Sequence, residues 1–181
     1  MACETITAGR KLACKGLIGG LKNVYFINSG TDVTISADDT VAASDFADAT
    51  AYKYELNRDS SLTQNIQANR ENGTVVFEQV VELTLLKITA EDNKQIKLLS
   101  FGRPHVVVED YNGNFLLVGA EHGADVSGGT IVTGTAMGDF SGYTLTLTGM
   151  EKTPANSITG NFIGGTPGTD GPTISEGSDN P

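Results

Sequence analysis

Apolar residues are grouped in short runs along the chain, and most of these runs have the length or the two-residue period of β-strands. The first run, Val24 to Ile27, lies within residues 23–28 and is typical of a short buried strand. Residues 29–50 are rich in Gly, Ser, Asp, Thr and Ala, with Val33 and Ile35 as an alternating apolar pair. We expect a short strand there, inside a long acidic loop.

The longest extended pattern covers residues 51–88 and predicts a β-hairpin with limbs at 51–66 and 74–88. The Asn72-Gly73 pair between the limbs favours the positive φ of a hairpin turn. One face of the second limb is apolar and carries Val75, Phe77, Val81, Leu83 and Leu85. Because a limb of about 14 residues exceeds the usual strand of about 5–6 residues, its apolar side chains need a partner.

One helix is predicted at about residues 90–100, with Thr89 as the cap of its first turn and Ile96 and Leu99 in its apolar stripe. Further strands are predicted on both sides of the turn at Asn112-Gly113, around residues 130–133, and at residues 143–148. The pattern therefore indicates a mostly β fold, a β-sandwich or barrel with a long hairpin and one flanking helix.

The predicted elements divide the 181 residues into three parts, a length that suits one domain with extensions. Residues 1–22 form an N-terminal arm, residues 23–160 the β domain with the hairpin at 51–88, and residues 161–181 a C-terminal tail. The tail is rich in Gly and Pro, a composition typical of a flexible segment. If it is ordered, we expect something outside the domain to hold it.

The chain carries 12 Lys and Arg residues against 22 Asp and Glu residues, a formal charge of −10. This balance disfavours the neutralisation of nucleic-acid phosphates as its main activity. No apolar run reaches the ~18 residues of a membrane span, and the start lacks the apolar region of a signal peptide. We therefore expect a protein made and kept in a cytoplasm, in which Cys3 and Cys14 are more simply free thiols than a disulfide.

The sequence contains no recognisable catalytic, cofactor-binding or metal-binding motif. The two histidines, His105 and His122, do not lie in a ligand pattern such as H-E-x-x-H. Adjacent strand residues point to opposite faces, so Glu109 and Asp110 are not expected to converge as an acid–base pair. The glycines of residues 16–20 match no phosphate-binding loop. We therefore expect neither an enzyme nor a bound cofactor.

The order of the predicted elements resembles that of bacteriophage tail tube proteins. It consists of a long hairpin, a capped helix, a tight Asn-Gly hairpin, a glycine-rich loop and a terminal Thr-Leu strand. Residues 138–156, Gly-Asp-Phe-Ser-Gly-Tyr-Thr-Leu-Thr-Leu-Thr-Gly-Met-Glu-Lys-Thr-Pro-Ala-Asn, resemble the closing strand of such proteins. Residues 9–15, Gly-Arg-Lys-Leu-Ala-Cys-Lys, and residues 19–26, Gly-Gly-Leu-Lys-Asn-Val-Tyr-Phe, are similar to small phage virion proteins. The resemblance covers roughly residues 5–158.

The resemblance implies a structural protein of the virion tail, assembled in the host cytoplasm. Six copies would form a ring, and the long hairpins would contribute strands to a continuous barrel around a lumen. The rings would stack, contact other tail or neck proteins, and let the genomic DNA pass without specific binding. On this hypothesis the candidate residues of the lumen face are Lys53, Glu55, Glu78 and Glu82.

The chain has a basic N-terminal segment and an acidic segment after it, and this separation of charge suggests a contact between copies. Cations are concentrated at Arg10, Lys11, Lys15 and Lys22, whereas residues 31–50 carry acids and no cations, among them Asp38, Asp39 and Asp45. In a closed ring of identical copies the interface is heterologous, so the basic segment of one copy can meet the acidic loop of the next. A solvated acidic loop without a partner is the alternative explanation.

Two other functions remain open from the sequence. A ring at the head–tail junction or a tail terminator can use the same fold without polymerising. A β-sandwich that binds a glycan or another surface ligand is less favoured, because the chain has no Trp and places Tyr25, Phe26, Phe77 and Phe115 inside apolar strands.

Overall fold

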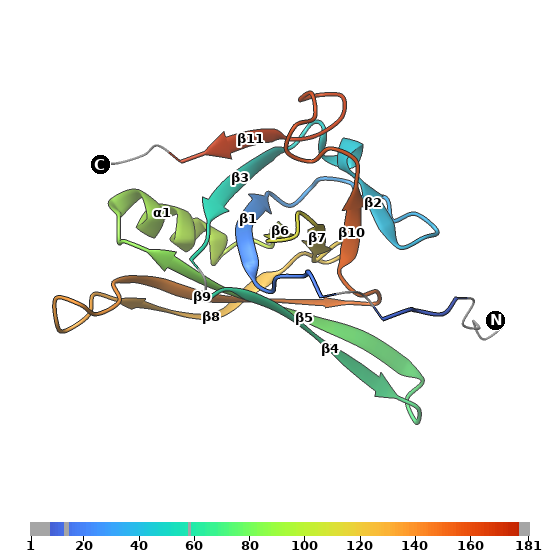
Figure 1. Ribbon diagram of the computed structural model, residues 1–181, viewed down its shortest axis with the longest axis horizontal. Coiled ribbons are helices and arrows are strands. Elements are labelled where there is room, and N and C mark those ends of the chain that lie inside the picture. Colours follow the sequence, from blue (N-terminus) through green and yellow to red (C-terminus); the bar gives the residue numbers. More distant parts are fainter. Residues whose placement is uncertain (1–7, 13–14, 58, 178–181) are drawn as a thin grey trace.

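The computed structural model describes residues 8–12, 15–57 and 59–177, and this part of the chain forms two β-sheets and one α-helix (Figure 1). In spatial order, sheet A consists of β11 (Thr173–Glu176), β3 (Thr50–Glu55), β1 (Leu21–Ile27), β6 (His105–Asp110), β7 (Phe115–Val118), β10 (Asn156–Thr159) and β2 (Thr40–Ala42). Sheet B consists of β4 (Ser61–Asn69), β5 (Thr74–Leu86), β9 (Gly142–Glu151) and β8 (Asp125–Val132). The helix α1 spans Ala90–Leu99, and a 3-10 helix, η1, spans Ala43–Phe46. The predicted mostly β fold with one helix is confirmed.

The first hydrophobic core lies between the two sheets. Sheet A contributes Val24, Phe26, Val106 and Val108, and sheet B contributes Val81, Leu83, Leu85, Tyr143, Leu145 and Leu147, all of them buried. These residues alternate along their strands, so each strand turns one row of side chains into this layer. The alternation predicted for residues 81–85 therefore marks the face of β5 that packs on sheet A.

A second core lies on the other face of sheet A, inside its curl. It contains Ile27 and the aromatic residues Tyr25, Phe46 and Phe162. The ring of Phe162 packs edge to face against Tyr25 and against Phe46, with ring centroids 5.4 Å and 5.8 Å apart. Because β1 is covered on both faces, its sequence reads as a continuous apolar run instead of an alternating one.

Helix α1 lies at the edge of the first core and has no fully buried residue. The hydroxyl of Thr89 accepts the N–H of Asp92 at 3.0 Å, as predicted for the cap of the first turn. Ile96 and Leu99 are half-buried against the core, and the hydroxyl of Tyr143 donates to Asn93 Oδ1 at 2.8 Å. A few contacts therefore hold the helix in place.

The predicted hairpin over residues 51–88 is wrong in its first limb. Residues 50–55 form β3, which pairs with β1 and β11 in sheet A, and only Ser61–Asn69 pairs with β5 in sheet B. Leu56, Asn57, Asp59 and Ser60 lie in the connection between the two sheets, where polar turn formers interrupt the strand pattern. The observed hairpin turns at residues 70–73, with Gly73 at φ 61°, as the Asn-Gly signal predicted.

The boundary predicted at residue 160 is also corrected. Phe162 is 1% exposed in the second core, and β11 pairs in parallel with β3 from Thr173 to Glu176. The domain itself therefore contacts this segment through Phe162 and β11. Composition misled the prediction because one buried aromatic ring and four strand residues are enough to fix a segment rich in Gly and Pro.

Candidate functional site

The most distinctive surface of the molecule is the outer face of sheet B, which is the side directed away from sheet A. Because Val81, Leu83 and Leu85 point into the first core, the residues between them on β5 point outward. The register of the sheet then assigns these residues to the outer face: Ser61, Thr63, Asn65, Gln67 and Asn69 of β4; Thr74, Val76, Glu78, Val80, Glu82, Thr84 and Leu86 of β5; Gly142, Thr144, Thr146, Thr148 and Met150 of β9; and Asp125, Gly128, Thr130 and Val132 of β8. Most of these side chains are small hydroxyls or amides.

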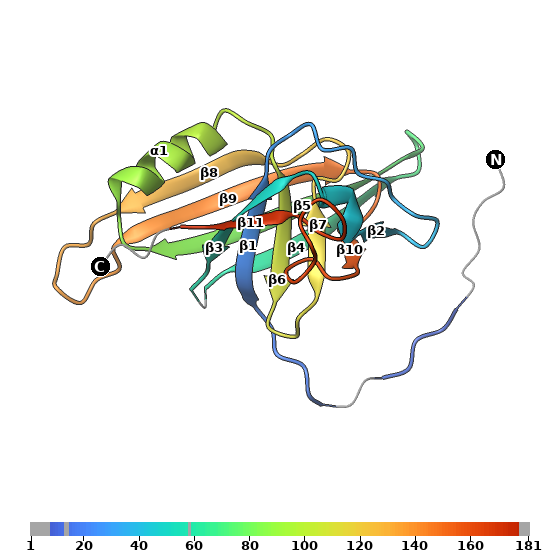
Figure 2. The same cartoon turned by 90° about the horizontal axis from the view of Figure 1, so that it is seen from above.

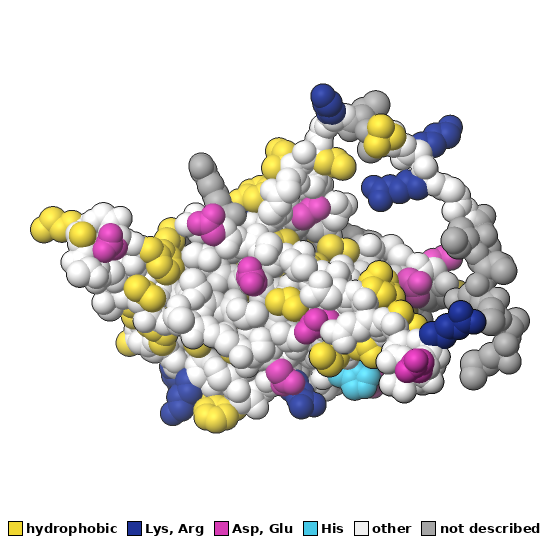
Figure 3. Space-filling view, turned by 90° about the horizontal axis from the view of Figure 1, so that it is seen from below, with side chains coloured by type: hydrophobic (Ala, Val, Ile, Leu, Met, Phe, Trp, Pro, Cys, Tyr) yellow, Lys and Arg dark blue, Asp and Glu magenta, His cyan; other side chains and the backbone are white. Residues whose placement is uncertain are grey.

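The strands of this outer face are acidic and contain no Lys or Arg. Glu78 and Glu82 supply carboxylates on the outer side, and Asp125 at the start of β8 is paired with Arg103 Nε at 3.0 Å. Figure 3 views the molecule from below in Figure 1, and the middle of that face shows acidic side chains without dark blue ones. A polyanion approaching it meets a negative potential and finds no phosphate-binding side chain.

Both edges of sheet B are open within the described part of the chain, because β4 and β8 each pair on one side only. An unpaired strand edge presents free N–H and C=O groups to a neighbouring strand. The three pairings inside the sheet are all antiparallel, so β4 and β8 run in opposite directions. A second copy placed edge to edge can therefore continue the sheet in the antiparallel pattern.

The far end of the β4–β5 hairpin extends beyond the body of the molecule (Figure 1). We call residues 65–78 the hairpin tip. On its inner side Ile66 lies opposite Phe77, and Val75 lies opposite Ala68. Ile66 is 68% exposed and Val75 is 52% exposed, although the alternating pattern is that of a core-facing strand. Of the apolar inner face of the hairpin, only the tip is therefore left without cover by the described chain.

The four residues predicted for the lumen face do not share one face. Glu78 and Glu82 lie on the outer face of sheet B, whereas Lys53 and Glu55 lie on β3 in sheet A. Lys53 Nζ contacts Glu176 Oε1 at 2.9 Å and Glu55 Oε1 at 3.4 Å. The hydrogen bond that Lys53 donates to the carboxylate of Glu176 raises the pKa of Lys53. The prediction failed for this pair because β3 was assigned to the wrong sheet.

The cations predicted to meet another copy divide into two groups. Arg10, Lys11 and Lys15 are exposed on the N-terminal arm, but Lys22 Nζ forms an ion pair with Glu109 Oε1 at 2.9 Å. Lys22 is therefore engaged within its own chain. Cys3 and Cys14, in the same segment, lie outside the described residues.

The acidic loop retains two of its three predicted contact residues at the surface. Asp38 and Asp39 are exposed, whereas Asp45 Oδ2 accepts the N–H of Thr34 at 2.9 Å and so stabilises the loop itself.

Glu109 is a buried carboxylate held by three donors. It accepts hydrogen bonds from Lys22, from Asn23 Nδ2 at 2.6 Å and from the hydroxyl of Tyr25 at 2.9 Å. Burial opposes its ionisation, but these hydrogen bonds together outweigh burial and lower its pKa. Asp110 points elsewhere and accepts the N–H groups of Asn112 and Asn114 at 2.8 Å each. As expected, the two carboxylates do not converge.

The structure also brings together Glu121, His122 and Glu151, a cluster that sequence analysis missed because 29 residues separate its parts. Their candidate ligand atoms lie within 4.8 Å of one another, close enough for a metal ion. However, Glu151 Oε1 accepts the N–H groups of Glu121 and His122 at 3.0 and 2.8 Å, and Glu151 Oε2 contacts His122 Nδ1 at 3.0 Å. These bonds explain the buried glutamate as the anchor of the turn at residues 119–123.

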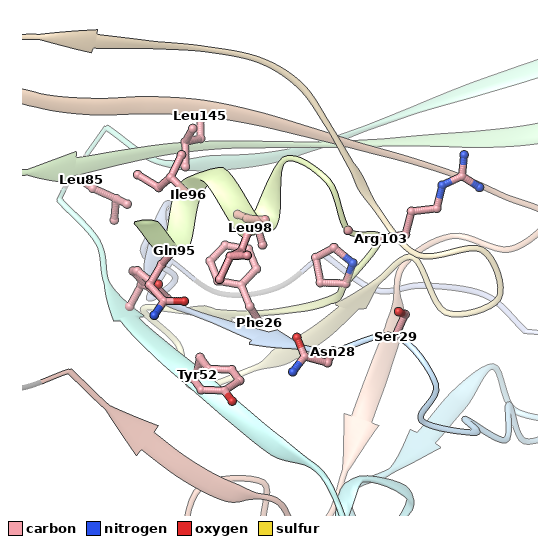
Figure 4. Close-up of a pocket in the computed structure, with 14 residues that line it drawn as sticks. Phe26, Asn28, Ser29, Tyr52, Leu85, Gln95, Ile96, Leu98, Arg103 and Leu145 are labelled. Atoms are coloured by element: carbon pink, nitrogen blue, oxygen red, sulfur yellow. The ribbon is translucent and has the colours of Figure 1, made fainter. Parts of the chain in front are cut away.

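A pocket of about 270 Å³ lies between α1, β1 and β3 and reaches sheet B (Figure 4). Its wall includes Phe26, Tyr52, Ile96, Leu98 and Leu145, with Asn28, Gln95 and Arg103 as polar members. We call it the helix pocket. It contains no His, Cys or carboxylate, and its chemistry is that of an apolar docking site.

Comparison with known proteins finds no matching family model, no matching curated protein and no matching solved structure. No helix in residues 8–12, 15–57 and 59–177 is long and apolar enough to cross a membrane. The structural observation from which a function can be proposed is therefore the geometry of sheet B.

Proposed function

We propose that this chain is a structural subunit of a bacteriophage tail tube, in which copies assemble into hexameric rings that stack around a lumen for DNA. Sheet B is the part of each copy that builds the wall. The single observation that carries the proposal is the combination of two open edges with an outer face that is acidic and free of Lys and Arg.

The strand directions support closure of sheet B into a barrel. A copy contributes four strands, and its β8 and β4 edges are antiparallel to each other. If β8 of one copy lies beside β4 of the next, every pairing around the ring is antiparallel, whatever the number of copies. Closure also removes the exposed edges, which otherwise favour uncontrolled association.

The charge of the outer face supports its position at the lumen. With this face turned inward, Glu78 and Glu82 of each copy would form rings of carboxylates, whereas Asp125 is paired with Arg103. These groups repel phosphates over about a Debye length, ~10 Å at 0.1 M salt, so DNA slides without being held. The hydroxyls of Thr144, Thr146 and Thr148 keep the wall wetted between the charges.

Negative-stain electron microscopy of the purified full-length protein over a concentration series tests the proposal. We expect rings or tubes with a central hole at high concentration, because edge pairing is a mass-action process. Monomers at every concentration would contradict it. Single rings that never stack would instead indicate the head–tail connector or tail terminator, which shares the fold.

A variant separates edge pairing from non-specific association. Ile66→Lys places a charge on the exposed inner side of β4, and Met137→Lys places the same charge in the loop between β8 and β9, where Met137 is fully exposed. We expect the first variant to remain monomeric and the second to assemble like the wild type. Equal assembly of both variants would exclude the β4 edge from the interface.

A further inference from the structure

Residues 8–12 and 15–20 of the N-terminal arm carry apolar side chains that the rest of the described chain leaves exposed. Leu12 is 100% exposed, Leu17 72% and Ile18 63%. The described contacts of the arm are at its end: Ile18 exchanges two hydrogen bonds with the Asn112 side chain, and Gly20 lies against the ring of Tyr111. Three exposed aliphatic residues on an extended segment are costly in water and suit burial against a partner.

The helix pocket is a mostly apolar site that no described segment of the chain fills. Leu98, which lines it, is 57% exposed, and Tyr52 is 41% exposed. Carboxylates lie next to it, because the first turn of α1 carries Glu91 and Asp92 one turn before the lining residues Gln95 and Ile96. The opposite end carries Arg103, whose charge is matched by Asp125 at 3.0 Å.

We infer that the N-terminal arm of one copy docks in the helix pocket of a second copy. Leu12, Leu17 and Ile18 would supply the apolar contact, and Arg10, Lys11 and Lys15 would lie near Glu91 and Asp92. The inference rests on the proposed function, because it names a contact by which copies of the subunit bind each other.

The arm starts on the side of the molecule away from the pocket of its own chain. It is pinned at Ile18 to the turn between β6 and β7 and leaves the body on the side opposite α1 (Figure 2). Leu12 lies six positions before Ile18, which limits the reach of this stretch to about 20 Å. The proposed contact is therefore intermolecular, and it is heterologous, as a ring or a stack of rings requires.

This contact differs from the one predicted between the basic segment and residues 31–50. In that loop Asp45 is used internally, because its carboxylate accepts the N–H of Thr34. The helix pocket offers both apolar surface and nearby carboxylates, which matches the mixed character of the arm.

Disulfide trapping between singly substituted full-length proteins tests the contact. Leu12→Cys or Leu17→Cys in one protein is mixed with Leu98→Cys in another, with Cys3 and Cys14 replaced by Ser in both. A disulfide requires the two Cα atoms to approach within about 7 Å. Met137→Cys, fully exposed in the loop between β8 and β9 and outside the lining of the helix pocket, is the control partner, and Asp38→Cys reports the acidic loop.

We expect several-fold more covalent dimer with Leu98→Cys than with Met137→Cys or Asp38→Cys. Preferential trapping at Asp38→Cys would overturn the inference in favour of the acidic loop. No trapping at Leu98→Cys in samples that show rings by electron microscopy would overturn it while leaving the tube proposal intact. Trapping at Leu98→Cys in samples that never exceed dimers would support the arm contact and contradict the tube.

Discussion

The root and the tip of the β4–β5 hairpin have the same sequence pattern but different surroundings. At the root Val81, Leu83 and Leu85 alternate with outward residues and are at most 8% exposed beneath sheet A. At the tip Ile66 and Val75 continue the same alternation and are more than half exposed. Sheet A ends before the hairpin does (Figure 1).

This difference shows how a pattern in one chain can describe a contact with another. Period-two alternation reports that a strand face is to be covered, but it does not report what covers it. For the root the cover is sheet A of the same copy. For the tip, on the proposed function, the cover is the neighbouring copy, and the two regions should then respond to mutation in different ways.

The largest effect on stability is expected at the root. Leu83→Ala removes a side chain that is 1% exposed and leaves a cavity between the sheets, which should lower the free energy of unfolding by about 2–5 kcal/mol. Urea denaturation under conditions where the protein is monomeric measures this change. Val75→Ala, the matched change at the tip, should cost less than about 0.5 kcal/mol. Similar losses from both variants would erase the distinction between root and tip.

A smaller loss is expected at the boundary between the two regions, where Gln79 is 1% exposed. Its Nε2 donates to the carbonyl of Thr153 at 3.1 Å, and its Oε1 accepts the N–H of Gly119 at 3.0 Å. Gln79→Ala leaves both backbone groups without this partner and should cost about 1–3 kcal/mol by urea denaturation. Gln67→Ala, at the exposed tip, is the control and should have almost no effect.

Acid should lower the free energy of unfolding through Glu109 in the body of the domain and not through the hairpin tip. Because the folded state lowers the pKa of Glu109, this group stabilises the fold at neutral pH, and that contribution is lost as the pH falls below about 4.5 and through the folded pKa. Glu109→Gln should therefore flatten the decline of unfolding free energy in acid. Glu71→Gln, at the exposed turn of the tip, should leave the decline unchanged. An unaltered acid profile in Glu109→Gln would count against this role.

Sequence patterns predicted the helix cap, one turn and the inward rows of two strands, because these features depend on residues that are close together in the sequence. The cap at Thr89, the turn at Gly113 with φ 82°, and the inward rows of β5 and β9 each follow from a few neighbouring residues. The assignment of β3 failed because strand pairing joins distant segments. β3 finds β1 and β11 across the chain, and the polar break at residues 56–60 alone could not identify these partners.

The candidate site was predictable only in part. Glu78 and Glu82 were correctly given a common face, since they are four residues apart on one strand. The absence of Lys and Arg from sheet B as a whole could be seen only when β4, β5, β9 and β8 were known to be neighbours. The ion pair between Lys22 and Glu109 was missed for the same reason, with 87 residues between its members.

The smallest effect on stability, and the sharpest test of the comparison, is expected from Ile66→Lys at the tip. Because Ile66 is 68% exposed in one copy, replacing it should change the free energy of unfolding of the monomer by no more than about 0.5 kcal/mol. In the assembled state the same position would be covered, and a buried lysine without a partner is strongly unfavourable. Sedimentation velocity should therefore show loss of assembly in a protein of wild-type stability. A variant that loses stability and assembly together would mean that its own chain already covers the tip, and that the hairpin needs no neighbour.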